Sequence, residues 1–337
     1  MKQINLAFIA TGFMGTLYAR ICNHLSDVNI IALHDIDGNS SAALAEELNT
    51  TAYNDANYQK MFEDHPEIDA VVITTPEDHH VAPTLTALEA GKHIFLDKPL
   101  ATSNEDAHII LNALSANKVI SMIGYSLRFD PRYVAAKNSV EQGEIGNVIS
   151  FVARRNMPLA VLERLGARVE SPFWVGVHDI DMMRWIAGSN VNRVMAMVTK
   201  KGLEEWDING SYFALLHFEN GVIAVLENTW SPVNPLVRAQ PFVFKVEGTE
   251  GQIMVRSYEM GVTVYREQGV LEPDTFYMPP SYNRYTGVYL DQMAYFLQCL
   301  REGKQTDIPL EEGLNGVMAA EAIIKSAAER QEIVLVV

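Results

Sequence analysis

The chain has 337 residues, of which 48% are hydrophobic and 20% are charged, as in a typical soluble globular protein. A single hydrophobic core rarely grows beyond about 250 to 300 residues, so this length predicts two domains. The 42 acidic residues against 26 basic ones leave a formal net charge of -16. This charge argues against nucleic acid and membrane surfaces as partners.

The two cysteines, Cys22 and Cys299, match no metal or redox spacing, which indicates reduced thiols in a reducing compartment. The N-terminal residues read as a first strand rather than a signal peptide, and no apolar stretch approaches the roughly 20 residues of a spanning helix. We therefore expect a cytoplasmic protein.

Residues 1–123 alternate short apolar runs with longer amphipathic stretches, a pattern typical of a doubly wound parallel sheet. The near-continuous apolar character of the runs indicates strands buried on both faces. The predicted strands are 4–9, 30–33, 70–73, 93–96 and 119–123, and the predicted helices are 14–24, 40–48, 80–89 and 104–116.

Residues 124–337 have a different pattern, in which apolar and polar residues alternate along several long segments. This alternation indicates half-buried antiparallel strands. The predicted strands are 148–154, 193–199, 211–218, 222–229 and 242–247, and the predicted helices are 132–141, 287–301 and 311–328. We expect an α+β domain built on a large open, mostly antiparallel sheet, whose last helix could return to the first domain.

The segment 10–15, Ala-Thr-Gly-Phe-Met-Gly, lies between the first predicted strand and the first predicted helix. It matches a dinucleotide-binding fingerprint in which alanine replaces the first glycine. Gly12 would let the backbone approach a pyrophosphate, and Gly15 would let the helix pack against the strand. Asp35 ends the second strand, where a carboxylate binds the ribose hydroxyls and favours NAD over NADP. The alternative is an ordinary strand-to-helix turn with a solvated aspartate.

Two further polar motifs follow later strands, at the edge where open α/β sheets bind ligands. Thr-Thr-Pro-Glu-Asp-His-His occupies 74–80, and Asp-Lys-Pro occupies 97–99. Lys98 could be a general acid/base of lowered pKa that accepts a hydroxyl proton, or a solvated loop lysine.

The segment 176–185 has helical periodicity, and His178 and Asp181 share one face of that helix. A substrate-binding histidine oriented by the aspartate is one interpretation, and a core histidine is another. A metal site is a third, but it lacks another ligand nearby, and we expect no metal.

Together these motifs resemble the glucose-fructose oxidoreductase, inositol dehydrogenase and MocA (Gfo/Idh/MocA) family of nicotinamide-dependent enzymes. The resemblance also uses Gly124 to Pro131 and Glu312-Gly313-Leu314, and it covers nearly the whole chain. It implies a Rossmann domain over 1–123, a substrate-binding and oligomerisation domain over 124–337, and hydride transfer between a nicotinamide and a sugar or cyclitol carbon. It implies that Lys98 and His178 are catalytic. The implied cofactor-binding residues are Gly12, Phe13, Met14, Gly15, Asp35, Thr75, Pro76, His80, Asp97 and Lys98.

The sequence departs from the family pattern at three positions. Asp97 replaces the usual glutamate, Glu77 replaces an asparagine, and Trp174 replaces an aspartate found four residues before the histidine in many family members. Tryptophan can stack on a sugar face but cannot accept a proton. The expected substrate-binding residues are Lys98, Arg155, Trp174, His178 and Asp181.

Three hypotheses follow for the function. An NAD-dependent dehydrogenase acting on a sugar or polyol is the main one, with a homo-oligomer as the expected assembly. A catalytically silent nicotinamide-binding regulator on the same fold is the alternative, since fold does not determine function. A metal-dependent hydrolase or lyase using His178 and Asp181 is the third.

Overall fold

The computed structural model describes residues 3–54, 57–231, 242–256, 261–267, 269–282 and 284–335. The chain forms two compact units, and the polypeptide passes between them more than once. The first unit contains residues 1–126 and 277–314, and the second contains 127–276 and 315–337. The first break thus lies after residue 126, and the later part of the chain is divided between both units.

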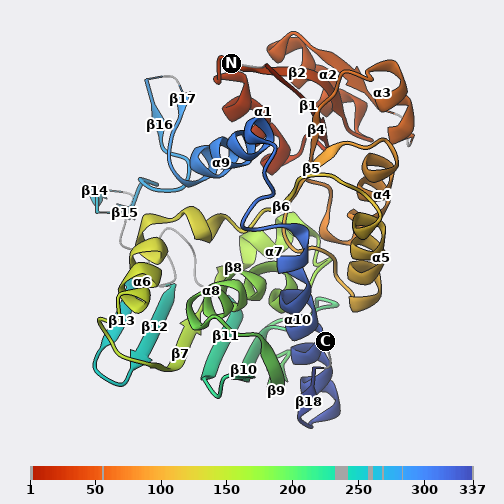
Figure 1. The fold of residues 1–337 in the computed structure, drawn as a ribbon. Helices are drawn as coiled ribbons and strands as arrows, with labels where there is room; N and C mark the ends of the chain where they lie inside the picture. Colours follow the sequence, from red (N-terminus) through yellow and green to blue (C-terminus); the bar gives the residue numbers. More distant parts are fainter. Residues whose placement is uncertain are drawn as a thin grey trace. The chain divides into compact units, whose positions relative to one another are not determined.

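The first unit is a parallel six-stranded sheet with the order β3-β2-β1-β4-β5-β6 (Figure 1). This order is that of a Rossmann fold, which confirms the predicted fold class. Its elements are β1 (Ile4–Ile9), α1 (Phe13–Asn23), β2 (Val28–His34), α2 (Gly38–Leu48), β3 (Thr51–Tyr53), α3 (Tyr58–Asp64), β4 (Ala70–Ile73), η1 (Glu77–His79), α4 (Val81–Glu89), β5 (His93–Leu96), α5 (Asn104–Ser115), β6 (Ser121–Ile123), β16 (Pro280–Ser281), β17 (Arg284–Tyr285), α9 (Val288–Glu302) and η5 (Leu310–Glu312).

Burial accounts for most of the predicted strands of this sheet. Every residue of β4 is buried, as are all but one residue in each of β1 and β5. The edge strand β3 and helix α3 were not predicted, because β3 is short and its side chains are largely exposed, which leaves no apolar run to detect. Helix α5 begins as expected, since Ser103 caps it by accepting a hydrogen bond from the Asp106 backbone N–H at 3.1 Å.

Helix α9 belongs to the first unit, although its sequence follows the second-unit strands. It packs against α1, and the Tyr18 hydroxyl donates a hydrogen bond of 2.8 Å to Oε1 of Gln292, with both side chains buried. Phe296 meets Phe95 of β5 with ring centroids 5.7 Å apart. A long-range contact of this kind leaves no trace in local periodicity, so only the folded chain shows that this helix returns.

The second unit has an eight-stranded mixed sheet whose main path runs β13-β12-β7-β11-β10-β9-β18, with β8 paired to β11. Strands β7 and β8 run parallel to β11, and the other pairs are antiparallel, as expected for a mostly antiparallel sheet. Its elements are α6 (Pro131–Glu141), β7 (Val148–Arg154), β8 (Met157–Pro158), α7 (Leu159–Leu165), η3 (Pro172–Gly176), α8 (Val177–Ala187), β9 (Val191–Thr199), β10 (Ser211–Phe218), β11 (Ile223–Ser231), β12 (Val243–Gly248), β13 (Gln252–Arg256), β14 (Val264–Arg266), β15 (Gly269–Leu271) and β18 (Ile333–Val334), with η2 (Ser126–Phe129) and α10 (Gly313–Glu329) beginning at the unit boundaries.

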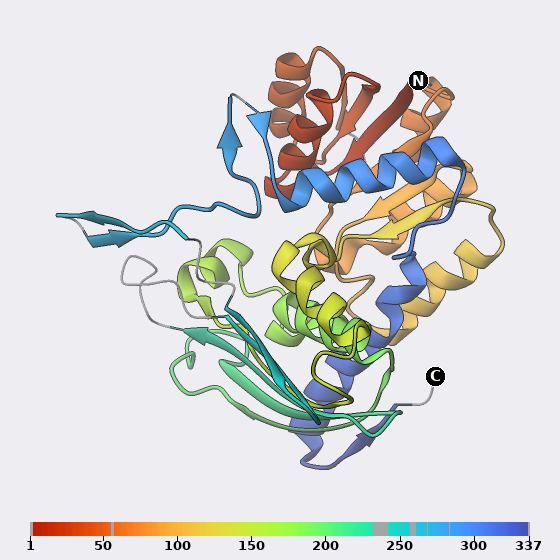
Figure 2. The same ribbon diagram turned by 60° about the vertical axis from the view of Figure 1, so that its left-hand side comes forward.

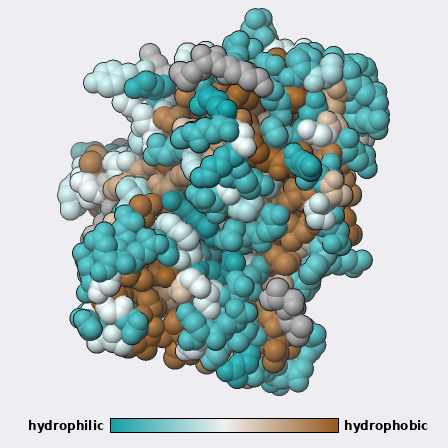
Figure 3. All heavy atoms as spheres, viewed as in Figure 1, coloured by the Kyte–Doolittle hydropathy of each residue, from teal (hydrophilic) through white to brown (hydrophobic). Residues whose placement is uncertain are grey.

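Helices α6, α8 and α10 cover one face of this sheet, as Figure 2 shows. The opposite face carries alternating apolar side chains that remain exposed: Val152, Met195, Met197, Phe213, Leu215, Ile223, Val225 and Met254. In Figure 3, apolar atoms reach the surface at the lower left, over strands that Figure 1 labels β7, β12 and β13. An exposed apolar face of this extent is typical of an interaction surface.

Candidate functional site

The loop between β1 and α1 makes the tight turn that its glycine pattern predicts. Ala10, which stands where the fingerprint has a glycine, has φ +72°, a left-handed conformation that costs an alanine roughly 1 kcal/mol. Gly15 is packed so closely that a Cβ there would lie 2.0 Å from the Ala10 carbonyl oxygen and 2.7 Å from Oγ1 of Thr74. Only glycine fits at position 15.

Asp35 holds this loop in place from the end of β2. One carboxylate oxygen accepts hydrogen bonds from the Thr11 backbone N–H at 2.6 Å and from the Thr11 hydroxyl at 3.1 Å. The other oxygen accepts the Asp37 backbone N–H at 2.9 Å. A negative charge is therefore fixed beside the glycine loop, where it would meet the adenosine ribose of a dinucleotide.

The start of α1 fits a pyrophosphate group. Gly12 is its N-cap, no side chain caps the helix among the described residues, and a Cβ at Gly12 would meet no atom within 4 Å. The N-terminus of the helix thus lies beside open space at Gly12, and the helix dipole favours an anion there. Phe13, which follows Gly12, is 59% exposed.

The remaining polar motifs of the first unit lie at the same sheet edge as this loop. Ile9 of β1 pairs with Ile73 of β4, and Ile73 pairs with Leu96 of β5. Because these strands are parallel, the segments that follow them emerge together. The register thus brings the glycine loop, Thr75 and Lys98 to one edge, as expected.

His80 connects two of these loops. The ring is 1% exposed; Nδ1 lies 2.7 Å from the Pro99 carbonyl oxygen, and Nε2 lies 3.1 Å from the Thr75 carbonyl oxygen. Burial lowers the pKa of His80, while the two carbonyls and the Glu77 carboxylate oppose that shift. The geometry gives His80 a positioning role between the loops, and its direct contact with a cofactor stays a prediction.

Asp97 supports the backbone of Lys98. Its Oδ1 accepts the Lys98 backbone N–H at 2.9 Å, and Gly124 lies against the same oxygen, since a Cβ there would be 2.8 Å away. Burial raises the pKa of the Asp97 carboxyl to about 6, although the Lys98 charge and the N–H bond act to lower it. Lys98 itself is half-buried at the end of β5 and precedes a cis proline.

In the second unit, Trp174 and His178 lie on one continuous helical segment. Residues Pro172–Gly176 form a π-helix that leads directly into α8. Trp174 stacks on Trp230 of β11, with ring centroids 5.5 Å apart and an interplanar angle of 29°. π-helical turns of this kind occur frequently at functional sites.

The acidic residues of α8 bind two buried arginines. Asp181 accepts two hydrogen bonds from Arg128, at 3.0 and 2.6 Å, and Asp179 accepts two from Arg155, at 2.9 and 2.8 Å. Arg155 also donates to the Tyr133 hydroxyl at 3.1 Å. Both pairs are at least nine-tenths buried, so they anchor α8, and substrate contacts by Arg155 and Asp181 stay predictions.

Besides the two arginine–aspartate pairs, two further features of the site were not predicted. Trp230 lies one residue beyond the predicted strand 222–229 and was given no role, because nothing in the local sequence distinguishes a tryptophan that stacks on a helix from an ordinary core tryptophan. The pairing of His80 with two carbonyl groups was missed for the same reason, since backbone carbonyls carry no sequence signal. The two adjacent histidines, His79 and His80, were the sequence feature that hinted at this role.

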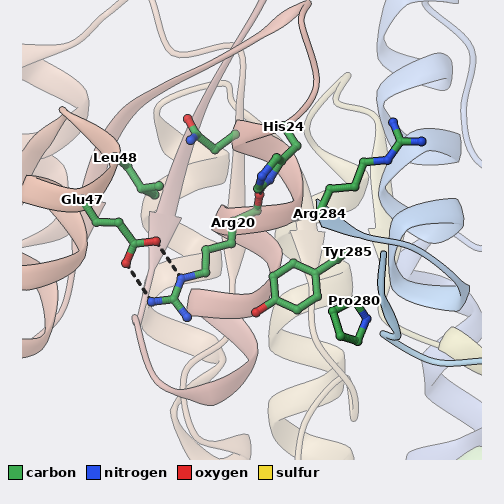
Figure 4. Close-up of a pocket in the computed structure, with 8 residues that line it drawn as sticks. Arg20, His24, Glu47, Leu48, Pro280, Arg284 and Tyr285 are labelled. Carbon is green, nitrogen blue, oxygen red and sulfur yellow. Dashed lines mark hydrogen bonds and ion pairs between the residues drawn. The ribbon is translucent and has the colours of Figure 1, made fainter. Parts of the chain in front are cut away.

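A pocket of about 330 Å³ lies elsewhere in the first unit, between α1, α2 and the β16–β17 hairpin (Figure 4). Its lining is Arg20, Asn23, His24, Glu47, Leu48, Pro280, Arg284 and Tyr285. Arg20 and Glu47 form a bidentate ion pair at 2.8 and 2.7 Å across it. None of the predicted site residues lines this pocket.

The part of the chain that the structure describes contains no group of three or more His, Cys, Asp or Glu side chains arranged to hold a metal ion. In the same residues, no helix is both long enough and apolar enough to cross a bilayer. Cys22 and Cys299 are buried and unbonded to each other, and burial raises the pKa of both thiols.

Comparison with known proteins identifies the family. A model of the Gfo/Idh/MocA oxidoreductase family, described by its NAD-binding Rossmann fold, matches residues 4–125, and a model of the Gfo/Idh/MocA C-terminal domain matches residues 133–254. The chain therefore belongs to the Gfo/Idh/MocA family of oxidoreductases. This finding confirms the resemblance inferred from the motifs and the assignment of an NAD-binding enzyme.

Several relatives are similar over nearly their whole length. A scyllo-inositol 2-dehydrogenase (NAD(+)) of Bacillus subtilis (strain 168) is 27% identical, over 90% of this chain and 87% of its own. A crystal structure of myo-inositol 2-dehydrogenase from Lactobacillus plantarum superposes with a TM-score of 0.85 at 24% identity, covering 99% of this chain and 100% of the other. A crystal structure of scyllo-inositol dehydrogenase from Lactobacillus casei, with bound NAD(H) and scyllo-inositol, superposes with a TM-score of 0.81 at 21% identity, covering 99% of both chains.

Proposed function

We propose that the protein is a dehydrogenase that transfers a hydride between NAD and a CH–OH carbon of a sugar or cyclitol, with Lys98 and His178 handling the proton. The main support is the register of β1, β4 and β5, which brings a lysine to the same sheet edge as a dinucleotide loop. The names of the relatives, which include a scyllo-inositol 2-dehydrogenase (NAD(+)) and two other inositol 2-dehydrogenases, support the substrate class.

The chain's own residues suit the cofactor. Gly12 and the first N–H groups of α1 would hold the pyrophosphate, and Asp35 would accept the adenosine ribose hydroxyls. Residues 35–41 contain no basic side chain that could bind a 2′-phosphate, and Asp35 would repel one, so NAD is preferred over NADP. When bound, the nicotinamide supplies the hydride acceptor.

Lys98 is the proposed proton acceptor for the substrate hydroxyl. As the C–H bond breaks, Nζ of Lys98 removes the hydroxyl proton, so that a carbonyl forms on the same carbon. Asp97 holds the Lys98 backbone from one side and His80 holds the Pro99 carbonyl from the other. A lysine whose backbone is held at both neighbours loses less freedom when it binds substrate.

His178 and Trp174 are the proposed substrate-binding residues of the second unit. His178 can donate or accept a hydrogen bond to a hydroxyl, and Trp174 offers an aromatic face. Asp181 and Arg155 support substrate binding by fixing α8 through their buried ion pairs.

The exposed apolar sheet face supports a homo-oligomer. Phe213 and Leu215 of β10, both more than half exposed, are flanked by apolar side chains on β9 and β11. A second copy of the chain would cover this face and remove its apolar surface from water. Dimer and tetramer are both compatible with this proposal, and a cytoplasmic location stays a prediction of the sequence.

The proposed function is tested by following nicotinamide absorbance for wild type and Lys98→Met with NAD or NADP and a panel of inositols, free sugars, sugar phosphates and nucleotide sugars. Wild type should turn over a member of the panel. The turnover rate of Lys98→Met should be roughly 10²- to 10⁴-fold lower, with unchanged cofactor affinity. Lys118→Met, on the exposed surface, is the matched control. Cofactor binding without turnover of any compound would favour the silent regulator, and a fully active Lys98→Met would remove Lys98 from the mechanism.

A further inference from the structure

The helical segment that carries His178 offers very little surface. Within residues 171–183, all of which the structure describes, every side chain is buried except Trp174 and His178, which are half-buried. The two are four positions apart, so they lie on the same side of the segment. Whatever binds this part of the second unit meets an indole and an imidazole side by side.

Trp174 is held rigidly by Trp230. Trp230 is 3% exposed and stacks against the Trp174 ring at 5.5 Å, so one face of Trp174 is covered. The π-helical segment can approach β11 this closely because residue 176 is glycine, where a Cβ would lie 2.6 Å from Oδ1 of Asn228. The remaining surface of Trp174 is therefore an aromatic surface that is ordered before any ligand arrives.

The charges of this segment are already matched. Arg128 and Arg155, which both contact α8, form bidentate pairs with Asp181 and Asp179, and their side chains are 6% and 7% exposed. Releasing either arginine to bind an anion would leave a buried carboxylate without its partner, which is strongly unfavourable. These two cations are thus unsuited to bind a phosphate or carboxylate group of a substrate.

We propose that the Trp174–Trp230 stack is the platform on which the ring of a neutral sugar or cyclitol rests, and that it selects against phosphorylated and carboxylated sugars. This inference rests on the proposed function and assigns Trp230 to the substrate site as a positioning residue. The apolar C–H face of such a ring packs on the indole, and a hydroxyl reaches His178. An anionic substituent gains nothing there and loses its hydration.

The test compares neutral ring compounds with their phosphate esters and uronic acids on wild type, Trp174→Phe, Trp174→Ala and Trp230→Leu. We expect kcat/KM at least tenfold higher for the neutral compound. Trp174→Ala and Trp230→Leu should raise KM roughly tenfold with little change in kcat, because they remove binding that substrate and transition state share. Trp174→Phe, which keeps an aromatic face, should recover most of the affinity.

Trp185→Phe is the matched control. Trp185 lies on the same helix and is also half-buried, but its ring contacts the Arg128 and Lys137 cations at 5.6 and 5.8 Å. Its replacement should leave KM unchanged. An unchanged KM in Trp174→Ala, or a preference for the phosphate ester, would overturn the proposal.

A second readout separates this proposal from the proposed function. Tryptophan fluorescence is titrated with the same neutral and anionic compounds, without turnover. If no compound is oxidised, the dehydrogenase proposal fails, yet a fluorescence change with neutral rings that is lost or strongly weakened in Trp174→Ala and persists in Trp185→Phe would still support the platform. No change with any neutral ring, or the same change at the same ligand concentrations in Trp174→Ala, would reject it.

Discussion

The two units hold their candidate site residues in different ways. In the first unit, the residues lie on loops that directly follow buried parallel strands, and backbone groups hold them. The His80 ring lies within hydrogen-bond distance of the Thr75 and Pro99 carbonyls, and the Thr74 hydroxyl donates to the Ala10 carbonyl. In the second unit, they lie on a helix that side chains anchor from distant segments. Arg128 reaches Asp181 and Arg155 reaches Asp179.

This difference separates two kinds of constraint. The position of a loop that follows a strand is set by the register of the sheet. Its tolerance to substitution therefore depends on its backbone conformation and on how closely other backbone segments pack against it. A helix anchored by buried ion pairs depends on charge balance instead. Substitutions that remove the two kinds of constraint should therefore affect the protein in different ways.

The largest effect is expected at the buried ion pairs. Arg155→Met leaves Asp179 buried without its partner, and we expect a loss of about 3 to 5 kcal/mol in the free energy of unfolding. Arg20→Met, at the exposed pair with Glu47, should cost at most about 1 kcal/mol. Urea unfolding monitored by circular dichroism measures both.

Asp179→Asn shows whether Arg155 is structural or binds substrate. If Arg155 only anchors α8, this variant should lose comparable stability, and both variants should keep the wild-type KM in their folded fraction. A KM raised in Arg155→Met alone would restore the predicted substrate contact.

The next effect separates the two glycines of the loop between β1 and α1. Gly12→Ala should fold normally, because its Cβ meets no protein atom within 4 Å, but it should weaken NAD binding roughly 10- to 100-fold by blocking the pyrophosphate. Gly15→Ala should destabilise the first unit itself, since its Cβ would collide with the Ala10 carbonyl. Thermal unfolding and NAD titration distinguish these outcomes, and normal NAD affinity in Gly12→Ala would contradict the assigned loop.

A smaller effect is expected for cofactor selectivity. Asp35→Ser removes the carboxylate that repels a 2′-phosphate, so the ratio of kcat/KM for NAD to that for NADP should fall about tenfold or more. Asp37→Ser, two residues further on, is the control, because serine can still cap α2. Unchanged selectivity in Asp35→Ser would remove Asp35 from the ribose site.

The smallest effect concerns the pH dependence of turnover. Lys98 lowers the pKa of Asp97, and by reciprocity the Asp97 carboxylate favours the charged form of Lys98. Asp97→Asn removes that charge and keeps an acceptor for the Lys98 N–H, so the pH at which kcat/KM for oxidation rises should fall by roughly 0.5 to 1 unit. Glu89→Gln, an exposed carboxyl, should leave the profile unchanged. A profile that does not move would uncouple Asp97 from the reaction.

Much of the first unit could be predicted from the sequence because its determinants are local. Apolar runs marked β1, β4 and β5, and the glycines marked the tight turn between β1 and α1. The left-handed conformation of Ala10 is a consequence of the same pattern, since the turn is required even where the glycine is missing. Polar residues after parallel strands reach one edge by topology, whatever their identity.

The tertiary structure alone decided the rest, since it depends on residues far apart in sequence. The return of α9 to the first unit, the pairing of Arg128 with Asp181 and the stacking of Trp174 on Trp230 each join separate segments. A helical period shows that residues 176–185 form a helix, but it cannot tell which partner neutralises Asp181 or covers Trp174. Patterns along the chain report the burial and direction of each residue, whereas charge balance and stacking depend on its partner in space.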